Sequence, residues 1–169
     1  MRFGLIGVVM FLCASVLSSV GSARADEPVR IGIIGLDTSH TPAFAKEFNA
    51  EHSDDDPLAG FQVVAAYPFG SKTIESSSSR IPGYTEQLKS MGIEIVDSIS
   101  ELLSKVDCVL LETNDGTIHH EQALQVFAAG KTVFIDKPVG SNLAETIAIF
   151  DAAKHYDVPV FSSSSLRYS

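Results

Sequence analysis

The hydrophobic positions of this chain form short apolar runs that alternate with longer amphipathic segments. Continuous apolar runs of this length are typical of strands that are covered on both faces of a parallel sheet. The runs that we interpret as strands are residues 30–35 (RIGIIG), 61–67, 93–96, 106–112, 132–135 and 158–161.

Amphipathic segments between these runs predict the helices. Pro42 suits the first position of a helix over residues 42–52, because its fixed φ angle fits a helix and its missing N–H is not needed there. Ser39 or Thr41 is expected to cap this helix. A shorter helix is expected over residues 84–91.

Local capping signals mark the later helices. Ser98 and Glu101 have the spacing of a capping box, and Asn142 and Glu145 repeat that spacing before a helix that runs to about residue 156. Gly130 follows a helical segment over residues 119–129, where a left-handed C-terminal cap favours glycine.

Strands that alternate with helices predict right-handed βαβ units and one parallel sheet. We therefore expect an α/β fold with a doubly wound, Rossmann-like parallel sheet in three layers. The expected strand order is 3-2-1-4-5-6.

The N-terminal residues resemble an export signal. Arg2 precedes an uncharged apolar run over residues 3–20, and Ala23-Arg24-Ala25 has the small-x-small pattern of a signal peptidase site. A membrane anchor is the alternative, but the run is at the short end of the about 17–25 residues that a spanning helix needs. We expect residues 1–25 to be a cleaved signal and residues 26–169 to form one exported domain, periplasmic or extracellular, without a stable membrane span.

The charge of the chain argues against one class of partner. The sequence has 12 basic and 21 acidic residues, which give a formal net charge of −9. Such a surface repels phosphate backbones, so nucleic-acid binding is not expected. Cys108 is the single cysteine of residues 26–169, and its apolar neighbours predict a buried, unreactive thiol.

Candidate site residues follow the strands. The carboxyl ends of parallel strands meet at one edge of the sheet, where ligands bind in this fold class. We expect one crevice lined by Gly35, Asp37 and His40 after the first strand, Thr113, Asn114 and His119 after the fourth, and Asp136, Lys137 and Pro138 after the fifth.

The loop after the first strand is similar to the dinucleotide fingerprint G-x-G-x-x-G, but it keeps only the first glycine, Gly35. Asp37 and His40 stand at the other two glycine positions, and a carboxylate there repels a pyrophosphate. The second strand also lacks a terminal acid for a ribose hydroxyl. These departures predict weakened NAD or NADP binding; alternatively, Asp37 and His40 serve helix capping and loop hydrogen bonds.

Lys137 is the candidate with the clearest chemistry. It directly follows a buried strand, so its ammonium is expected to face the crevice and to hold a substrate oxygen or lend a proton. A solvated lysine paired with Asp136 is the alternative. Pro138 is a candidate for a cis peptide bond. No metal site is predicted, because His119 and His120 lack partners at zinc-ligand spacing.

Several segments together resemble the N-terminal domain of the glucose–fructose oxidoreductase/inositol dehydrogenase (Gfo/Idh/MocA) family. They are RIGIIG at residues 30–35, ELL at 101–103, the segment 113–123, and AGKTVFIDKP at 129–138. The last is the most specific, since it is similar to the family pattern A-G-K-x-V-x-x-E-K-P with Asp136 in place of glutamate. Asn114 replaces the usual proline.

The resemblance implies site residues and chemistry. It implies that Lys137 takes part in catalysis beside the nicotinamide of NAD or NADP, and that Gly35, Thr113 and His119 match family positions. It also implies a small-molecule sugar or polyol as substrate. The family's substrate domain normally begins after an arginine–aromatic pair, here at residues 167–168, so we expect that this domain is missing and that the chain is a fragment.

Two main functions remain open from the sequence. One is the nucleotide-binding domain of an exported NAD(P)-dependent oxidoreductase that acts on a sugar or polyol hydroxyl. The other is a non-redox exported ligand-binding module on a degenerate Rossmann fold, which the altered glycine loop favours. A third, cofactor-assisted glycoside hydrolysis, follows only from the resemblance. Homo-oligomer formation also stays open.

Overall fold

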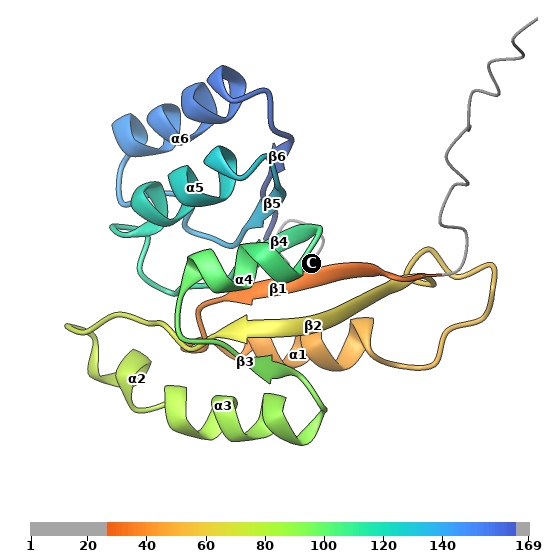
Figure 1. Cartoon of the computed structure of the whole chain (residues 1–169). Helices are drawn as coiled ribbons and strands as arrows, with labels where there is room; N and C mark the ends of the chain where they lie inside the picture. Colours follow the sequence, from red (N-terminus) through yellow and green to blue (C-terminus); the bar gives the residue numbers. More distant parts are fainter. Residues whose placement is uncertain (1–26, 165–169) are drawn as a thin grey trace, which may run out of the picture.

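Six parallel strands form one sheet in the order β3-β2-β1-β4-β5-β6 (Figure 1). The computed structural model describes residues 27–164. The strands are β1 (Val29–Ile34), β2 (Phe61–Tyr67), β3 (Glu94–Ile95), β4 (Cys108–Leu111), β5 (Thr132–Ile135) and β6 (Val160–Phe161). The predicted doubly wound α/β fold and its strand order are both confirmed.

Helices cover the two faces of the sheet and complete the three layers (Figure 1). Ile33 and Leu36 belong to a core with α1 and α3, whereas Leu111 and Ile135 belong to a larger core with α4, α5 and α6. The helices are α1 (His40–Phe48), α2 (Glu75–Ser78), α3 (Ile81–Ser90), α4 (Ile99–Lys105), α5 (His119–Ala128) and α6 (Leu143–His155).

The predicted caps of the later helices are present. The Ser98 side chain accepts a hydrogen bond from the Glu101 N–H at 3.1 Å, and the Asn142 side chain accepts one from the Glu145 N–H at 3.0 Å. Gly130 has a φ of +66°, as expected for the residue after α5. Local sequence therefore determines where α4 and α6 begin and where α5 ends.

The first helix differs from its prediction at both ends. It spans His40–Phe48 rather than residues 42–52, and its N-cap, Ser39, makes no side-chain capping bond. The Thr41 hydroxyl instead donates to the Gly35 carbonyl at 2.9 Å. The helix ends early because the Asn49 side chain bonds both the N–H and the C=O of Val63, at 2.8 and 2.9 Å.

The edges of the sheet are shorter than predicted, and one helix was not predicted. β3 and β6 have two residues each, and each is an edge strand that pairs with a single neighbour. The one-turn helix α2 lies in a serine-rich segment that lacks a hydrophobic period. These differences leave the strand order unchanged.

Some sequence predictions fall outside the described residues. They are the signal segment, residues 1–25, and the pair at residues 167–168. Within residues 27–164, no helix has the length and hydrophobicity needed to cross a membrane.

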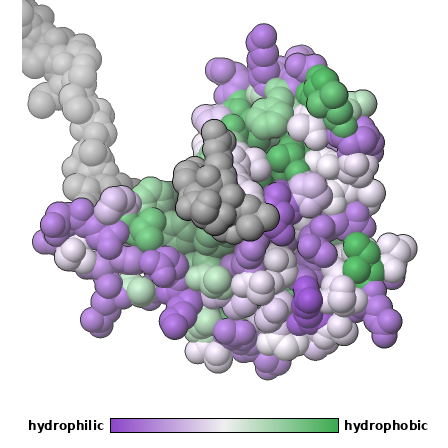
Figure 2. Space-filling view, turned by 180° about the vertical axis from the view of Figure 1, so that it is seen from behind, coloured by the Kyte–Doolittle hydropathy of each residue, from purple (hydrophilic) through white to green (hydrophobic). Residues whose placement is uncertain are grey.

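An apolar hollow of about 480 Å³ lies on the α1 side of the sheet. Phe61, Leu110, Phe134 and Phe161 line it, and Phe161 is 56% exposed. Figure 2 shows this side of the molecule, where hydrophobic residues gather next to the grey atoms. Among residues 27–164, the face that packs against α1 and α3 is therefore less completely covered than the face that packs against α4, α5 and α6.

Candidate functional site

The carboxyl ends of β1, β4 and β5 lie side by side, because β4 pairs with both β1 and β5. The loops after these strands, together with the first residues of α1 and α5, carry all the candidate site residues that the sequence identified. The structure therefore brings them to one edge of the sheet, but it does not expose them all to one crevice.

Asp37 is fully buried, so the expectation that it lines an open crevice is wrong. One carboxylate oxygen accepts the Asn114 N–H at 3.0 Å, and the other accepts the Ser71 N–H at 3.1 Å and the Ser77 hydroxyl. Asp37 thus ties together the loops after β1, β2 and β4. The alternative interpretation, loop hydrogen bonding, describes its observed contacts.

Gly35 is needed for packing between two of these loops. Its φ is +97°, and a Cβ there would lie 2.6 Å from Thr113 Cα. No other residue type fits this position without moving the end of β4, because both the backbone conformation and the space exclude a side chain. The glycine that matches the fingerprint therefore lets the β1 and β4 ends approach each other.

Thr113 and His119 are fully buried, so the expectation that they line the crevice is wrong. The Thr113 hydroxyl donates to Gln122 Oε1 at 3.0 Å. The two ring nitrogens of His119 lie 2.6 Å from the Thr113 carbonyl oxygen and 3.2 Å from the Val139 carbonyl oxygen. His119 therefore joins the loop after β4 to the loop after β5.

The open part of the edge lies beside α1 and β5. His40 Nδ1 lies 2.7 Å from Asp136 Oδ2, and the Asp136 side chain is 5% exposed, against 34% for His40. Lys137 is exposed, and within residues 27–164 its ammonium has no hydrogen-bond or ion-pair partner. The alternative Lys137–Asp136 pair is not formed, since Asp136 bonds His40. The Lys137–Pro138 peptide bond is cis, as expected.

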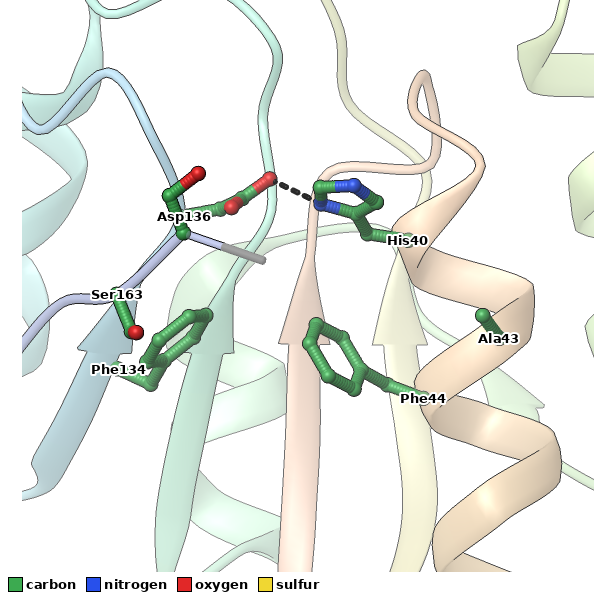
Figure 3. A pocket seen from close by; sticks show the side chains of 7 residues that line it. His40, Ala43, Phe44, Phe134, Asp136 and Ser163 are labelled. Atoms are coloured by element: carbon green, nitrogen blue, oxygen red, sulfur yellow. Dashed lines mark hydrogen bonds and ion pairs between the residues drawn. The ribbon is translucent and has the colours of Figure 1, made fainter. Parts of the chain in front are cut away.

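A pocket of about 530 Å³ opens beside the His40–Asp136 pair (Figure 3). Phe44 and Phe134 form apolar walls, with their ring centroids 5.9 Å apart. Ser163, which follows β6, also lines it. The pocket combines aromatic walls with an imidazole–carboxylate pair at its rim, which is the usual composition of a small-molecule site.

Glu112 is a site residue that the sequence analysis did not single out. It follows β4, it is fully buried, and neither of its carboxylate oxygens has a hydrogen-bond partner among the described residues. Burial, with a smaller contribution from the charge of Asp136, raises its pKa to about 8. An acid at the end of an otherwise apolar strand was the available signal.

These observations define a class of protein. A doubly wound parallel sheet with a glycine at the end of β1, a lysine–proline pair after β5 and a pocket at the carboxyl edge is a Rossmann-type domain. The comparisons with known proteins agree with this class.

The chain belongs to the Gfo/Idh/MocA oxidoreductase family, which has an NAD-binding Rossmann fold; the match covers residues 1–164. A relative described as an uncharacterised oxidoreductase of Streptococcus pneumoniae is 28% identical over 80 residues, which are 46% of this chain and 22% of that protein.

Solved structures of dehydrogenases share the fold. The scyllo-inositol dehydrogenase of Lactobacillus casei, solved with NAD(H) and scyllo-inositol, has a TM-score of 0.63 at 17% identity. The WlbA dehydrogenase of Bordetella pertussis, solved with NADH and UDP-GlcNAcA, has a TM-score of 0.61 at 20% identity. The match covers 85% of this chain and 38% and 37% of those chains, so this chain spans less than two fifths of either.

The residues at the β1 end fit a dinucleotide only in part. Thr38 and Ser39 lie at the start of α1, and within residues 27–164 their N–H groups have no hydrogen-bond partner, so an anion has donors there. In the dinucleotide fingerprint, the backbone at the position of Asp37 would meet a pyrophosphate. Here the loop after β2 covers that backbone, because Gly70 packs against Asp37 and the Leu36 N–H donates to the Phe69 carbonyl. The Lys137 side of the crevice stays open.

Proposed function

We propose that this domain is the nucleotide-binding part of an exported NAD(P)-dependent oxidoreductase that acts on a hydroxyl group of a sugar or polyol. The observation that supports this most is the exposed ammonium of Lys137, which makes no hydrogen bond or ion pair within residues 27–164 and directly follows Asp136, a residue that lines the pocket of about 530 Å³. The family supplies the cofactor class, and two solved relatives hold a cyclitol or a sugar nucleotide.

The chain's own residues contribute binding and electrostatics to such a reaction. Lys137 donates a hydrogen bond to the substrate oxygen and stabilises the negative charge that develops on it. The N–H groups at the start of α1 hold the cofactor phosphates. A bound nicotinamide would supply the hydride acceptor for oxidation of the carbinol carbon, or the hydride donor for reduction of the carbonyl carbon.

Cofactor binding is expected to be weak, because Asp37 and the loop after β2 close the glycine surface. Calorimetric titration of the chain with NAD and with NADP tests this directly.

Lys137→Ala leaves the fold intact and removes the ammonium; Lys131→Ala, at the other end of β5, is the matched control. Turnover of polyols by the longest chain that the gene encodes, lost in Lys137→Ala and kept in Lys131→Ala, supports the proposal.

A second candidate function is a non-redox exported ligand-binding module. The contacts of Asp37 favour it. Its carboxylate is held by Ser71, Ser77 and Asn114 at the position where a dinucleotide-binding loop would leave the backbone open to a pyrophosphate. A sugar or polyol that binds without NAD or NADP, together with no measurable binding of either dinucleotide, would establish this second function and exclude the first.

Export is part of both candidates. The apolar run at residues 3–20 and the Ala23-Arg24-Ala25 pattern support a mature N-terminus at Asp26. Intact-mass measurement on protein recovered from outside the cytoplasm tests this. Protein there that retains Met1 to Ala25 would contradict signal cleavage.

A further inference from the structure

Three metal-ligating side chains converge at the carboxyl edge of the sheet. His40 is the first residue of α1, Glu112 follows β4 and Asp136 follows β5. One ligand atom from each lies within 4.8 Å of the others. The three residues are far apart in sequence, so no local spacing motif reveals the cluster; the adjacency of β1, β4 and β5 creates it.

Glu112 supplies a second and independent indication of a missing ligand. Its side chain is fully buried, and both of its oxygens lack a hydrogen-bond donor within residues 27–164. Buried polar groups normally have a hydrogen-bond partner, because a buried polar atom without one loses its interaction with water and gains nothing in return. Asp136 and His40 bond each other at 2.7 Å and provide no donor to Glu112.

We propose that His40, Glu112 and Asp136 bind one divalent transition-metal ion of the Zn²⁺ or Mn²⁺ class. One imidazole nitrogen and two carboxylate oxygens are suitable ligands for these ions. Metal–ligand distances of about 2.0–2.2 Å place neighbouring ligand atoms about 3–3.5 Å apart. Side-chain rotation closes the remaining distance, and the ion gives Glu112 the partner that it lacks.

The ion is accessible to small molecules. His40 and Asp136, two of the three ligands, line the pocket of about 530 Å³ (Figure 3), so an ion held by them would be reached from that pocket. The walls from Phe44 and Phe134 are apolar. The ligand class that fits is a small molecule with an oxygen donor for the ion and an apolar face for the rings. This inference goes beyond the proposed function and does not depend on dinucleotide binding.

The chain contains a matched comparison for this site. His52 Nδ1 lies 3.1 Å from Asp56 Oδ2, which is the same residue pair without a buried third ligand. If histidine–aspartate pairs on this protein bound metal nonspecifically, Asp56→Asn would reduce binding as much as a substitution in the cluster.

The experiment is calorimetric titration of the chelator-stripped full chain with ZnCl₂ and with MnCl₂, together with metal analysis of the replete protein. The parent is expected to bind one ion. His40→Ala and Glu112→Gln are expected to raise the dissociation constant at least about tenfold, and Asp56→Asn is expected to leave it unchanged. Metal should also raise the melting temperature of the parent and not that of His40→Ala.

Glu112→Gln keeps the side-chain shape, and His40 is one-third exposed, so two independent variants keep the test decisive if one fails to fold. The proposal is overturned if the parent binds neither ion stoichiometrically, or if His40→Ala binds as tightly as the parent. Equal losses in Asp56→Asn and in the cluster variants would also overturn it.

Discussion

The Cα of Gly35 lies so close to Thr113 that a Cβ at Gly35 would be 2.6 Å from Thr113 Cα. This contact joins the ends of β1 and β4, the two strands at which the chain reverses its direction of winding. The pairing of these two strands positions His40 and Glu112 on the same edge. The geometry of the candidate site therefore depends on the close approach that Gly35 allows between these strand ends.

Gly35→Ala is expected to lower the free energy of unfolding by about 3 kcal/mol, because it adds both a left-handed backbone penalty and an overlap with Thr113. Gly130→Ala is the matched control: its φ is +66°, and a Cβ there meets nothing within 4 Å. It should cost about 1 kcal/mol. Urea unfolding of both variants measures the difference, and equal losses would show that the contact with Thr113 contributes nothing.

Asp37→Ala is expected to cost about 3 kcal/mol of unfolding free energy, since Ser71, Ser77 and Asn114 lose the acceptor that they share. Asp55 is exposed, and Asp55→Ala should change stability by less than about 0.5 kcal/mol. Denaturant titration tests both. An Asp37→Ala protein as stable as Asp55→Ala would contradict the structural role of the carboxylate.

Asp107 gives a pH-dependent prediction. Its side-chain hydrogen bonds with Arg30, followed by the bond from the Arg30 N–H, lower its pKa from 3.8 to about 2. A depressed pKa stabilises the folded state above pH 3.8, and the stabilisation is lost as the pH falls toward 2.

Asp107→Asn should therefore destabilise the protein by about 1 kcal/mol at pH 7, a figure reduced for solvent screening because both side chains are 44% exposed. The difference from the parent should shrink below pH 4. Urea unfolding at pH 7 and at pH 3 measures it, and an unchanged difference at the two pH values would contradict the assignment.

Lys137→Ala is expected to leave the free energy of unfolding within about 0.5 kcal/mol of the parent, because the ammonium is exposed and makes no hydrogen bond or ion pair within residues 27–164. Under the proposed function, NAD(P)-linked turnover of a polyol should fall by at least about a hundredfold in this variant. Steady-state kinetics and thermal unfolding on one preparation separate the two effects. A large loss of stability would show that Lys137 is structural.

Features that depend on neighbouring residues in the sequence were predictable. The hydrophobic runs indicated the strands, and the caps at Ser98 and Asn142 indicated where two helices begin. The strand order followed from the handedness of βαβ connections. The end of α1 was not predictable, because it depends on a side chain, Asn49, that bonds the distant Val63.

The candidate site was predictable in position but not in detail. Parallel strands brought the correct loops together, yet the sequence does not say which polar side chains turn inward. Asp37 and His119 became buried because loops from other strands supply their partners. Glu112 was missed for a related reason: one acid at a strand end can face water or the interior, and only the packing around β4 decides.

The buried carboxylate of Asp37 also determines how the crevice can move. The loops after β1, β2 and β4 share one acceptor, so we expect them to open as a single unit, with the amides of Ser71 and Asn114 exchanging with solvent together. His119 also joins the loop after β4 to the loop after β5, so the β5 side of the crevice is expected to follow that opening.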